Sequence, residues 1–360
     1  MKRLLPTPEA QKGSPLVATR NRRISAAAIS ALAIVIVTAV VVVVFAATRG
    51  TSATPNATAT QTAAPSSGKW LSGESGNGVT NGSFAKWRGR PVGIIGTWAD
   101  DNTNQVQFYQ LHKGGDFASY TGPMDMAVGA IGANESWAHA ATGAYNARWT
   151  TSLEKLKGLR ASATGTTYIR FAHEMNGDWY PWKVTASNYR DFLGAWKQYR
   201  ALQRKIFPEA KLVFSVNRES VGTGMDWTKF FPGKQYVDVL SVDYYNQNPA
   251  VMTAARWASS IQEKDQWGGP KGLAQHLAFA SKVGLPLAIS EWSTVADAGD
   301  SAEFVTQFLH YVRAHSGAKA GQIPYEILFD VPQNNNKFTL FGAGAKMPLA
   351  AAAYQKFFSQ

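Results

Sequence analysis

The stretch TTYIRFAHE, residues 166–174, is a run of β-branched and aromatic residues that ends on a histidine and a glutamate. Runs of this kind are typical of strands in a parallel sheet that helices cover on both faces. Six further short apolar runs follow the same pattern along the chain: PVGIIGTWA (91–99), MDMAVGAI (124–131), KLVFSVN (211–217), VDVLSVDYY (237–245), LPLAISEW (285–292) and PYEILFDV (324–331).

Stretches with apolar residues three and four positions apart alternate with these runs and predict helices over 146–159, 187–206 and 301–315. We expect an eighth strand near ESWAHAAT, residues 135–142. Eight strands that alternate with helices predict a (β/α)8 TIM barrel over residues 70–360. An open doubly wound sheet is the alternative, although no glycine-rich phosphate-binding fingerprint follows the first predicted strand.

Polar residues stand where the predicted strands end. In a (β/α)8 barrel these ends gather at one mouth, which carries the active site. Two of these polar residues, Glu174 and Glu291, are carboxylates at the ends of apolar strands, where a loop acid has no packing reason to lie. The residues at the strand ends are Trp98, Asp100, Asp101, His173, Glu174, Asn217, Arg218, 243–246, Glu291, Trp292 and Asp330.

Two carboxylates across a sugar ring are the requirement for hydrolysis of a glycosidic bond, because one protonates the leaving oxygen and the other attacks the anomeric carbon or activates water. Aromatic rings beside the two acids favour the same chemistry, since pyranose faces pack well on them; these rings are Trp179, Tyr180, Trp182 and Trp292. The alternative interpretation makes Glu174 and Glu291 structural acids that pair with Arg170 and Arg218.

The motifs RFAHEMNGDWYPW (170–182) and LAISEWS (287–293) resemble the acid/base and nucleophile signatures of the family 26 glycoside hydrolases. That family includes β-mannanases, mixed-linkage β-glucanases and β-1,3-xylanases. The resemblance implies a (β/α)8 barrel and a retaining mechanism. It also implies that Glu174 is the acid/base on the fourth strand and Glu291 the nucleophile on the seventh.

The resemblance implies further roles. His173 would orient the catalytic groups, and Tyr245 would hold the nucleophile through its hydroxyl, with Tyr244 as the rival because a one-residue slip reverses the side that faces the mouth. Trp179 and Trp182 are predicted as sugar platforms, with a core position as the alternative.

Other positions complete the predicted substrate-binding set. Trp292, Trp98 and Asn217 belong to it, and so does Asn176, which we expect to brace the loop after the acid. Asp100 and His139 are further candidates for the mouth, whereas Arg170 is expected to point inward as a buried brace.

One departure from the family bears on the substrate. Many members carry a tryptophan at the end of the eighth strand, beneath the sugar in the cleavage subsite. This chain has Phe329 and Asp330 in that region. Mannan specificity therefore does not follow from the resemblance.

The N-terminal part predicts a membrane anchor. Residues 24–47 are uncharged over a length that exceeds the ~20 residues needed to cross a bilayer. Basic residues concentrated before this segment place residues 1–23 in the cytoplasm and the barrel outside the cell, after a Thr/Ala/Pro/Ser-rich linker over 48–69. The alternative is a cleaved signal peptide and a secreted protein.

Charge and composition narrow the partners. The net charge is +12, and residues 1–49 contribute +6 of it, so the rest of the chain is only mildly basic and we expect no nucleic-acid partner. The chain has no cysteine, so the exported domain must fold without disulfides. No motif predicts a metal or another cofactor, and the sequence predicts no oligomeric state.

Together these patterns predict a retaining endo-β-glycosidase that acts on an extracytoplasmic β-linked polysaccharide or oligosaccharide, such as mannan, mixed-linkage glucan, xylan or an envelope polysaccharide. The alternative is a polysaccharide-binding or transglycosylating protein on the same fold, serving exopolysaccharide synthesis or export.

Overall fold

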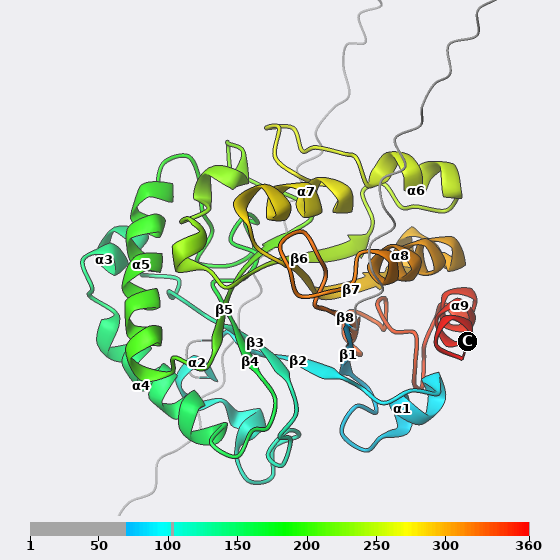
Figure 1. Ribbon diagram of the computed structural model, residues 1–360, viewed down its shortest axis with the longest axis horizontal. Helices are drawn as coiled ribbons and strands as arrows, with labels where there is room; N and C mark the ends of the chain where they lie inside the picture. The colour runs from blue at the N-terminus through cyan, green and yellow to red at the C-terminus, as the bar shows by residue number, and fades with distance from the viewer. Residues whose placement is uncertain (1–69, 102–103, 360) are drawn as a thin grey trace, which may run out of the picture. The chain divides into compact units, whose positions relative to one another are not determined.

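Eight parallel strands close into a barrel in the computed structural model, which describes residues 70–101 and 104–359 (Figure 1). Each strand pairs with the next along the chain, and the last pairs with the first, from Leu71 opposite Tyr325 to Gly76 opposite Asp330. The predicted barrel is confirmed and the open sheet is excluded. The strands are β1 (Leu71–Gly76), β2 (Ile94–Ala99), β3 (Met124–Val128), β4 (Thr167–Phe171), β5 (Lys211–Asn217), β6 (Val239–Asn246), β7 (Leu287–Thr294) and β8 (Tyr325–Asp330).

Helices surround the strands (Figure 1). In α8, Ser301 caps the first turn by accepting from the backbone N–H of Phe304, and apolar residues at helical spacing bury one face. The helices predicted over 146–159, 187–206 and 301–315 are confirmed as α4, α5 and α8. The helices are α1 (Ser83–Arg88), α2 (Asn104–Gln107), α3 (Trp137–Ala141), α4 (Asn146–Leu159), α5 (Tyr189–Ile206), α6 (Ala254–Ser260), α7 (Leu273–Val283), α8 (Ala302–Ala314) and α9 (Pro348–Phe358), with 3-10 turns η1 (Tyr109–Leu111), η2 (Trp227–Phe230), η3 (Lys234–Tyr236) and η4 (Ala296–Ala298).

The strand expected near residues 135–142 is wrong. That segment forms helix α3, which Ser136 caps by accepting from the backbone N–H of His139. The remaining strand is β1, in LSGESG, which has no apolar run to predict it. The two errors cancel in the count, so Glu174 still follows the fourth strand and Glu291 still lies on the seventh.

Side chains alternate between the barrel interior and the helix layer. The lower interior is filled by the apolar side chains of Ile94, Val213, Val239, Ala288, Tyr325 and Ile327. Above them lies a polar layer in which Asp125 accepts hydrogen bonds from Arg170, Ser290 and Tyr325. This polar layer supports the mouth of the barrel.

An irregularity in β7 turns Glu291 into the barrel. Ser241 of β6 lies opposite Ala288, whereas Asp243 lies opposite Glu291, so between these pairs one residue of β6 faces two of β7. Such a bulge resets the alternation of side chains. As a result, Ser290 bonds Asp125 inside the barrel and the next residue, Glu291, also faces inward.

Helices α1 and α9, from opposite ends of the barrel sequence, lie side by side over β1 and β8 (Figure 1). The Trp87 and Tyr354 rings stack at 5.7 Å between centroids. Arg88 is buried beneath them and donates to Ser72 Oγ and to the Tyr354 hydroxyl. These contacts tie the C-terminal helix to the strand that closes the barrel.

Within the described residues, 70–101 and 104–359, none of the helices has the length and apolarity to cross a membrane. The predicted cytoplasmic segment 1–23, anchor 24–47 and linker 48–69 lie outside the described residues.

Candidate active site

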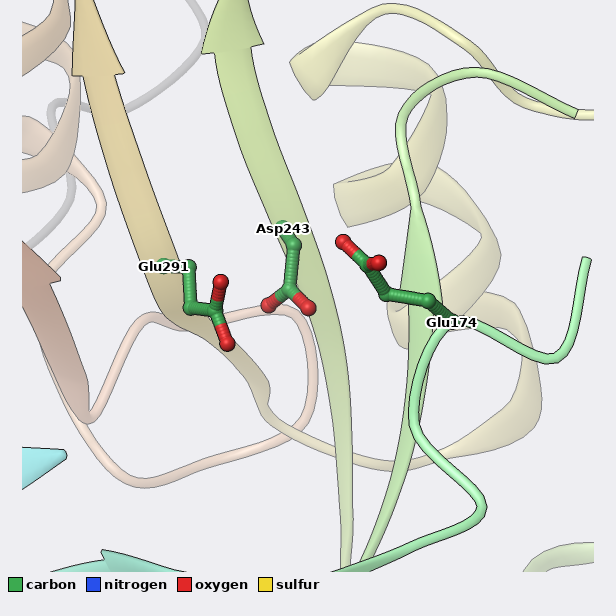
Figure 2. Close-up of side chains that lie close together, drawn as sticks. All are labelled: Glu174, Asp243 and Glu291. Atoms are coloured by element: carbon green, nitrogen blue, oxygen red, sulfur yellow. The ribbon is translucent and has the colours of Figure 1, made fainter. Parts of the chain in front are cut away.

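Three carboxylates meet at the mouth of the barrel: Glu174 after β4, Asp243 on β6 and Glu291 on β7 (Figure 2). One oxygen from each lies within 4.8 Å of the others. Glu174 and Glu291 border a cavity of about 760 Å³, and Asp243 is buried behind them. The cavity is lined by Trp98, Asp100, Glu174, Trp179, Tyr180, Asn217, Glu219, Val221, Tyr245, Gln247, Asn248, Glu291, Phe329, Val331, Gln333, Asn334, Lys337 and Phe338.

A strained turn presents Glu174. Strand β4 ends at Phe171, and both Ala172 (φ 54°) and Glu174 (φ 53°) adopt the left-handed conformation that side chains disfavour. The turn is held because the Glu174 N–H donates to Ser215 O at 3.0 Å. This geometry turns the carboxylate of Glu174 toward β6 and β7 (Figure 2).

Both oxygens of Glu174 accept hydrogen bonds. Asn217 Nδ2 donates to Oε1 at 2.5 Å, and Trp179 Nε1 donates to Oε2 at 2.7 Å. Asn176 positions Asn217 from behind, because its amide donates to Asn217 O and accepts from Asn217 N, each at 2.7 Å. Asn176 is fully buried and does not line the cavity, so its place is that of a brace.

Glu291 is held by three donors. Trp98 Nε1 and Arg170 Nη1 both donate to Oε1 at 2.7 Å, and the Tyr245 hydroxyl donates to Oε2 at 2.7 Å. Tyr244, the rival to Tyr245, faces the helix layer, where its ring stacks against Phe304 of α8.

Arg170 supplies the positive charge beneath the site. It is fully buried, and its Nε donates to Asp125 Oδ1 at 2.6 Å while Nη1 lies 3.3 Å from Asp243 Oδ2. One guanidinium therefore contacts three carboxylates, those of Asp125, Asp243 and Glu291. The predicted inward orientation of Arg170 is confirmed.

The environment separates the protonation states of the acids. Burial, reinforced by the negative charge of Glu291, raises the pKa of Glu174 to about 7, although the hydrogen bonds from Asn217 and Trp179 partly oppose the rise. Burial, and then the charge of Glu291, also raise the pKa of Asp243 well above its ordinary value. Glu174 can therefore carry a proton near neutral pH, as a general acid requires.

The same three carboxylates form the group, among the described residues, whose spacing suits a metal ion. Their surroundings do not fit one. Both oxygens of Glu174, both of Glu291 and Oδ2 of Asp243 already interact with N–H or O–H donors, and Arg170 already provides a positive charge. The donor set is that of a hydrogen-bonded carboxylate cluster.

The model of the family described as glycosyl hydrolase family 26 matches residues 127–263, which include Glu174. Endoglucanase H from Acetivibrio thermocellus is 31% identical over 154 residues, which are 41% of this chain and 16% of the relative. The mannan endo-1,4-beta-mannosidase A and B of Caldalkalibacillus mannanilyticus is 31% identical over 153 residues, 39% of this chain and 26% of the relative.

The chain is similar to glycosyl hydrolase family 26 over residues 127–263. Solved structures agree in fold. The catalytic domain of a GH26 endo-beta-1,4-mannanase from Bacillus sp. JAMB-750 superposes with a TM-score of 0.55 over 81% of this chain and 86% of that chain, at 13% identity. A GH26 beta-mannanase from Bacteroides ovatus gives 0.53 over 80% and 88%, at 12% identity. The chain spans only 16% and 26% of the length of the two curated relatives above.

Of the aromatic residues predicted for this site, some line the cavity and some support it. Trp179 is 44% exposed in the cavity, and Trp98 also lines it. Trp182 is buried, stacks on Tyr180 at 4.4 Å between ring centroids and donates to His173 O. Trp182 thus lies in the core, the alternative that the sequence left open.

His173 contacts Tyr180 and neither glutamate. Its Nε2 lies 3.0 Å from the Tyr180 hydroxyl and 3.8 Å from Asp100 Oδ2. Burial and the charge of Arg170 lower the pKa of His173 well below its ordinary value, so the ring is neutral. His173 positions Tyr180 in the cavity wall, and its ring makes no hydrogen bond to the carboxylate of Glu174 or Glu291.

Two predicted mouth residues lie elsewhere. Trp292 faces the helix layer, where Nε1 donates to Glu326 Oε2 at 2.5 Å and the ring stacks on Phe308. The reason is alternation, because Glu291 occupies the inward position of β7. His139 is exposed on α3 and does not line the cavity, whereas Asp100 does.

Sequence reasoning missed several site residues. Asp243 is expected at a strand end but is not predicted to lie beside the two glutamates, although it stands two positions before Tyr245 on the same strand and so faces the same side. The cavity residues on the connections after β6 and β8 lie in irregular backbone and have no periodic signal; these are Gln247, Asn248, Val331, Gln333, Asn334, Lys337 and Phe338.

Proposed function

We propose that the chain is a retaining endo-β-glycosidase that acts on a β-linked polysaccharide by double displacement. The observation that carries this is the approach of Glu174 and Glu291, whose nearest oxygens lie within 4.8 Å in an accessible cavity. Carboxyl groups about 5–5.5 Å apart are typical of retaining enzymes, whereas inverting enzymes need roughly 6.5–9.5 Å to admit a water.

Glu291 attacks the anomeric carbon in the first step. Trp98, Arg170 and Tyr245 hold its carboxylate, so little reorientation is needed on attack. Glu174 donates its proton to the departing glycosidic oxygen at the same time. The bond from the anomeric carbon to that oxygen breaks as the bond to Glu291 forms.

Glu174 acts as a base in the second step. Once Glu291 is esterified it loses its negative charge, which is one of the causes of the raised pKa of Glu174. The pKa of Glu174 then falls, and its carboxylate takes a proton from water as the water attacks the glycosyl enzyme. The product leaves with the configuration of the substrate.

The substrate orientation follows from these roles. The sugar that is attacked lies against Glu291, near Trp98, Tyr245 and Phe329, and the departing sugar lies beyond Glu174. Trp179 bonds Glu174 and is half-exposed, so it is placed as a platform for the departing side. The cavity is open and continues past both acids, which suits internal cleavage of a chain.

Mannan, mixed-linkage glucan, xylan and an envelope polysaccharide are the candidate substrates. Two relatives carry the names endoglucanase and mannan endo-1,4-beta-mannosidase, which supports a β-linked backbone. We further propose that residues 24–47 anchor the chain in the cell membrane with the barrel outside, or that they are removed as a signal peptide to release it. Both alternatives place the substrate outside the cytoplasm.

The test is turnover by the full-length chain on β-mannan, mixed-linkage β-glucan, β-1,3-xylan and the host's own exopolysaccharide. Glu291→Ala and Glu174→Ala should each lower kcat by several orders of magnitude. Azide should rescue Glu291→Ala with an inverted glycosyl azide and Glu174→Ala with a retained one, which separates the two roles. Glu154→Ala, at an exposed carboxylate of α4, is the control and should retain full activity.

Binding of an oligosaccharide without cleavage of any glycan on the panel would contradict the proposal. A sugar acceptor added to that assay would then separate a binding protein from a transglycosylase, because only the latter forms a longer product.

A further inference from the structure

The cavity extends past Glu291 onto the connection between β8 and α9. Val331, Gln333, Asn334, Lys337 and Phe338 line it from this connection. Gln247 and Asn248, after β6, complete this end of the cavity. Side-chain amides and an ammonium therefore replace the tryptophans that surround the two glutamates.

A chain of contacts places Lys337 relative to the reacting centre. The Tyr245 hydroxyl bonds Glu291 at 2.7 Å, and the Tyr245 ring lies 5.0 Å from the ring of Phe338 between centroids. Lys337 Nζ lies 4.9 Å from the centroid of Phe338. The ammonium thus stands on the Glu291 side of the cavity, where the sugar that is attacked and the sugars before it would lie.

Hydrogen bonds to β7, β8 and η4 hold the backbone around Lys337. Lys337 O accepts from Ala296 N at 2.8 Å, and Phe338 O accepts from Ser293 Oγ at 2.7 Å. Asp330 Oδ1 accepts from the backbone N–H groups of Leu340 and Phe341. The fold therefore holds the direction in which Lys337 leaves the chain.

The three residues before Lys337 adopt a backbone conformation that suits their side chains. Asn334, Asn335 and Asn336 have φ values of 49°, 60° and 57°. Asparagine tolerates this left-handed conformation better than most residues, so a run of three suits such a turn. The turn brings Asn334 and Lys337 to one side, where both line the cavity.

Lys337 has no ion-pair partner among the carboxylates of the described residues, and its ammonium lies over the ring of Phe338. Among the described residues that line the cavity it is the basic one. The acid Glu219 at the other end already pairs with Arg218 and Lys271. A half-buried ammonium without a counter-ion attracts an anion more strongly than one in bulk water.

We propose that Lys337, with Gln333 and Asn334, binds a carboxylate on the glycone side of the substrate, so that the preferred substrate is an anionic β-linked polysaccharide. The ammonium supplies the charge and the two amides supply N–H donors, which together suit a carboxylate of a uronic acid or of an acidic substituent. This inference rests on the proposed function, because the glycone side is defined by Glu291 as the nucleophile.

The test measures binding apart from turnover. The full-length Glu291→Ala protein is titrated calorimetrically with β-1,4-linked manno- and gluco-oligosaccharides and with the same oligosaccharides after oxidation of their primary hydroxyls to carboxylates. We expect the oxidised chains to bind about 10-fold more tightly, as expected for a charge-assisted hydrogen bond, with the preference shrinking as salt is raised.

Matched variants locate the effect. Adding Lys337→Gln to the Glu291→Ala protein should abolish the preference, and adding Lys337→Arg should retain most of it. Lys346→Gln is the control, since Lys346 is exposed on the same connection but does not line the cavity. Thermal unfolding of each variant reports whether it folds. Oligosaccharides that carry a succinyl half-ester in place of the C6 carboxylate separate an acidic substituent from a uronic acid.

The outcomes separate the two proposals. Equal binding of oxidised and neutral chains, no binding of oxidised chains, or a preference that survives Lys337→Gln would overturn the anionic subsite. The glycosidase proposal would remain intact if the native chain still cleaved a neutral glycan. A Lys337-dependent preference without cleavage of any glycan, neutral or oxidised, would support the subsite and contradict the glycosidase.

Discussion

Two opposed influences set the pKa of Glu174. Burial and the charge of Glu291 raise its pKa to about 7, and the N–H groups of Asn217 and Trp179 stabilise its carboxylate and limit the rise. In the proposed mechanism, catalysis by the acid form of Glu174 therefore fails as pH increases through this value. The alkaline limb of kcat/KM in the free enzyme reports this proton.

Trp179→Phe keeps an aromatic ring and removes the N–H that bonds Glu174 Oε2. The carboxylate loses a stabilising donor, so the pKa of Glu174 should rise and the alkaline limb should move upward by about 0.5–1 pH unit, the equivalent of one ordinary hydrogen bond. A pH profile of kcat/KM measures the shift. Trp182→Phe is the control, because the Trp182 N–H donates to His173 O instead. A limb that moves downward would contradict this account.

Tyr245→Phe removes the hydroxyl that bonds Glu291 Oε2 at 2.7 Å. We expect kcat to fall by roughly 10–100-fold, about 1.4–2.7 kcal/mol in activation free energy, because Glu291, the proposed nucleophile, is no longer held in its attacking position. Steady-state kinetics of Tyr245→Phe, beside Tyr244→Phe as the control, measures the effect. Tyr244→Phe should leave kcat unchanged, since Tyr244 faces the helix layer. Equal losses in the two variants would show that the hydroxyl of Tyr245 has no special role.

The sequence predicts the two glutamates because each ends an apolar strand beside aromatic rings. It fails at Trp292 for a physical reason. The bulge in β7 turns two consecutive residues inward, and alternation then sends Trp292 to the helix layer. A bulge depends on pairing with the neighbouring strands, and no local pattern in LAISEWST records it.

At the scale of elements, β1 shows why an irregular composition hides a strand. Its sequence, LSGESG, is shaped by its neighbours. A Cβ at Gly73 would lie 2.6 Å from Ile94 Cγ2, so only glycine fits beside that strand. The outward residues Ser72 and Glu74 are polar, and Ser72 accepts from the buried Arg88. These requirements come from β2, β8 and α1, which a search for apolar runs in one segment does not include.

Glu74 of β1 makes a prediction about stability. It is fully buried, both its oxygens lack a hydrogen-bond partner among the described residues, and burial, then the charge of Asp330, raise its pKa to about 9. The folded chain retains a proton that the unfolded chain releases above the ordinary value of 4.5. The stability from this proton is complete below that value and is lost as pH rises through about 9.

Glu74→Gln should therefore flatten the pH dependence. In the native sequence the contribution of Glu74 falls by at most about 1.4 kcal/mol in free energy of unfolding per pH unit across that window. The variant should gain stability relative to the native chain as pH increases, most at pH 9. Denaturant unfolding at pH 5, 7 and 9 measures this, with Glu154→Gln on the exposed face of α4 as the control. Parallel pH profiles for Glu74→Gln and the native chain would contradict it.

At the scale of the whole molecule, the closed barrel contains the complete cavity. Every residue that lines it falls between Trp98 and Phe338, and β1 pairs with β8 to close the sheet. The alternation of strands and helices predicts this architecture well. This alternation does not predict the connections that form the Lys337 end of the cavity. Their course depends on hydrogen bonds to residues of other strands, such as Ser293 and Asp330.

Deletion of residues 24–47 tests whether this segment anchors the chain in the membrane and whether the barrel works without it. The native chain should sediment with membranes of disrupted cells, and the deletion should move it to the supernatant, because the longest apolar segment is gone. On a soluble oligosaccharide kcat/KM should stay within about 2-fold of the native value, since every residue that lines the cavity falls between Trp98 and Phe338. An unrelated apolar segment of equal length in place of 24–47 should restore sedimentation. A native chain found outside the cell, shortened at its N-terminus, would instead identify residues 24–47 as a cleaved signal, and the barrel would act as a secreted enzyme.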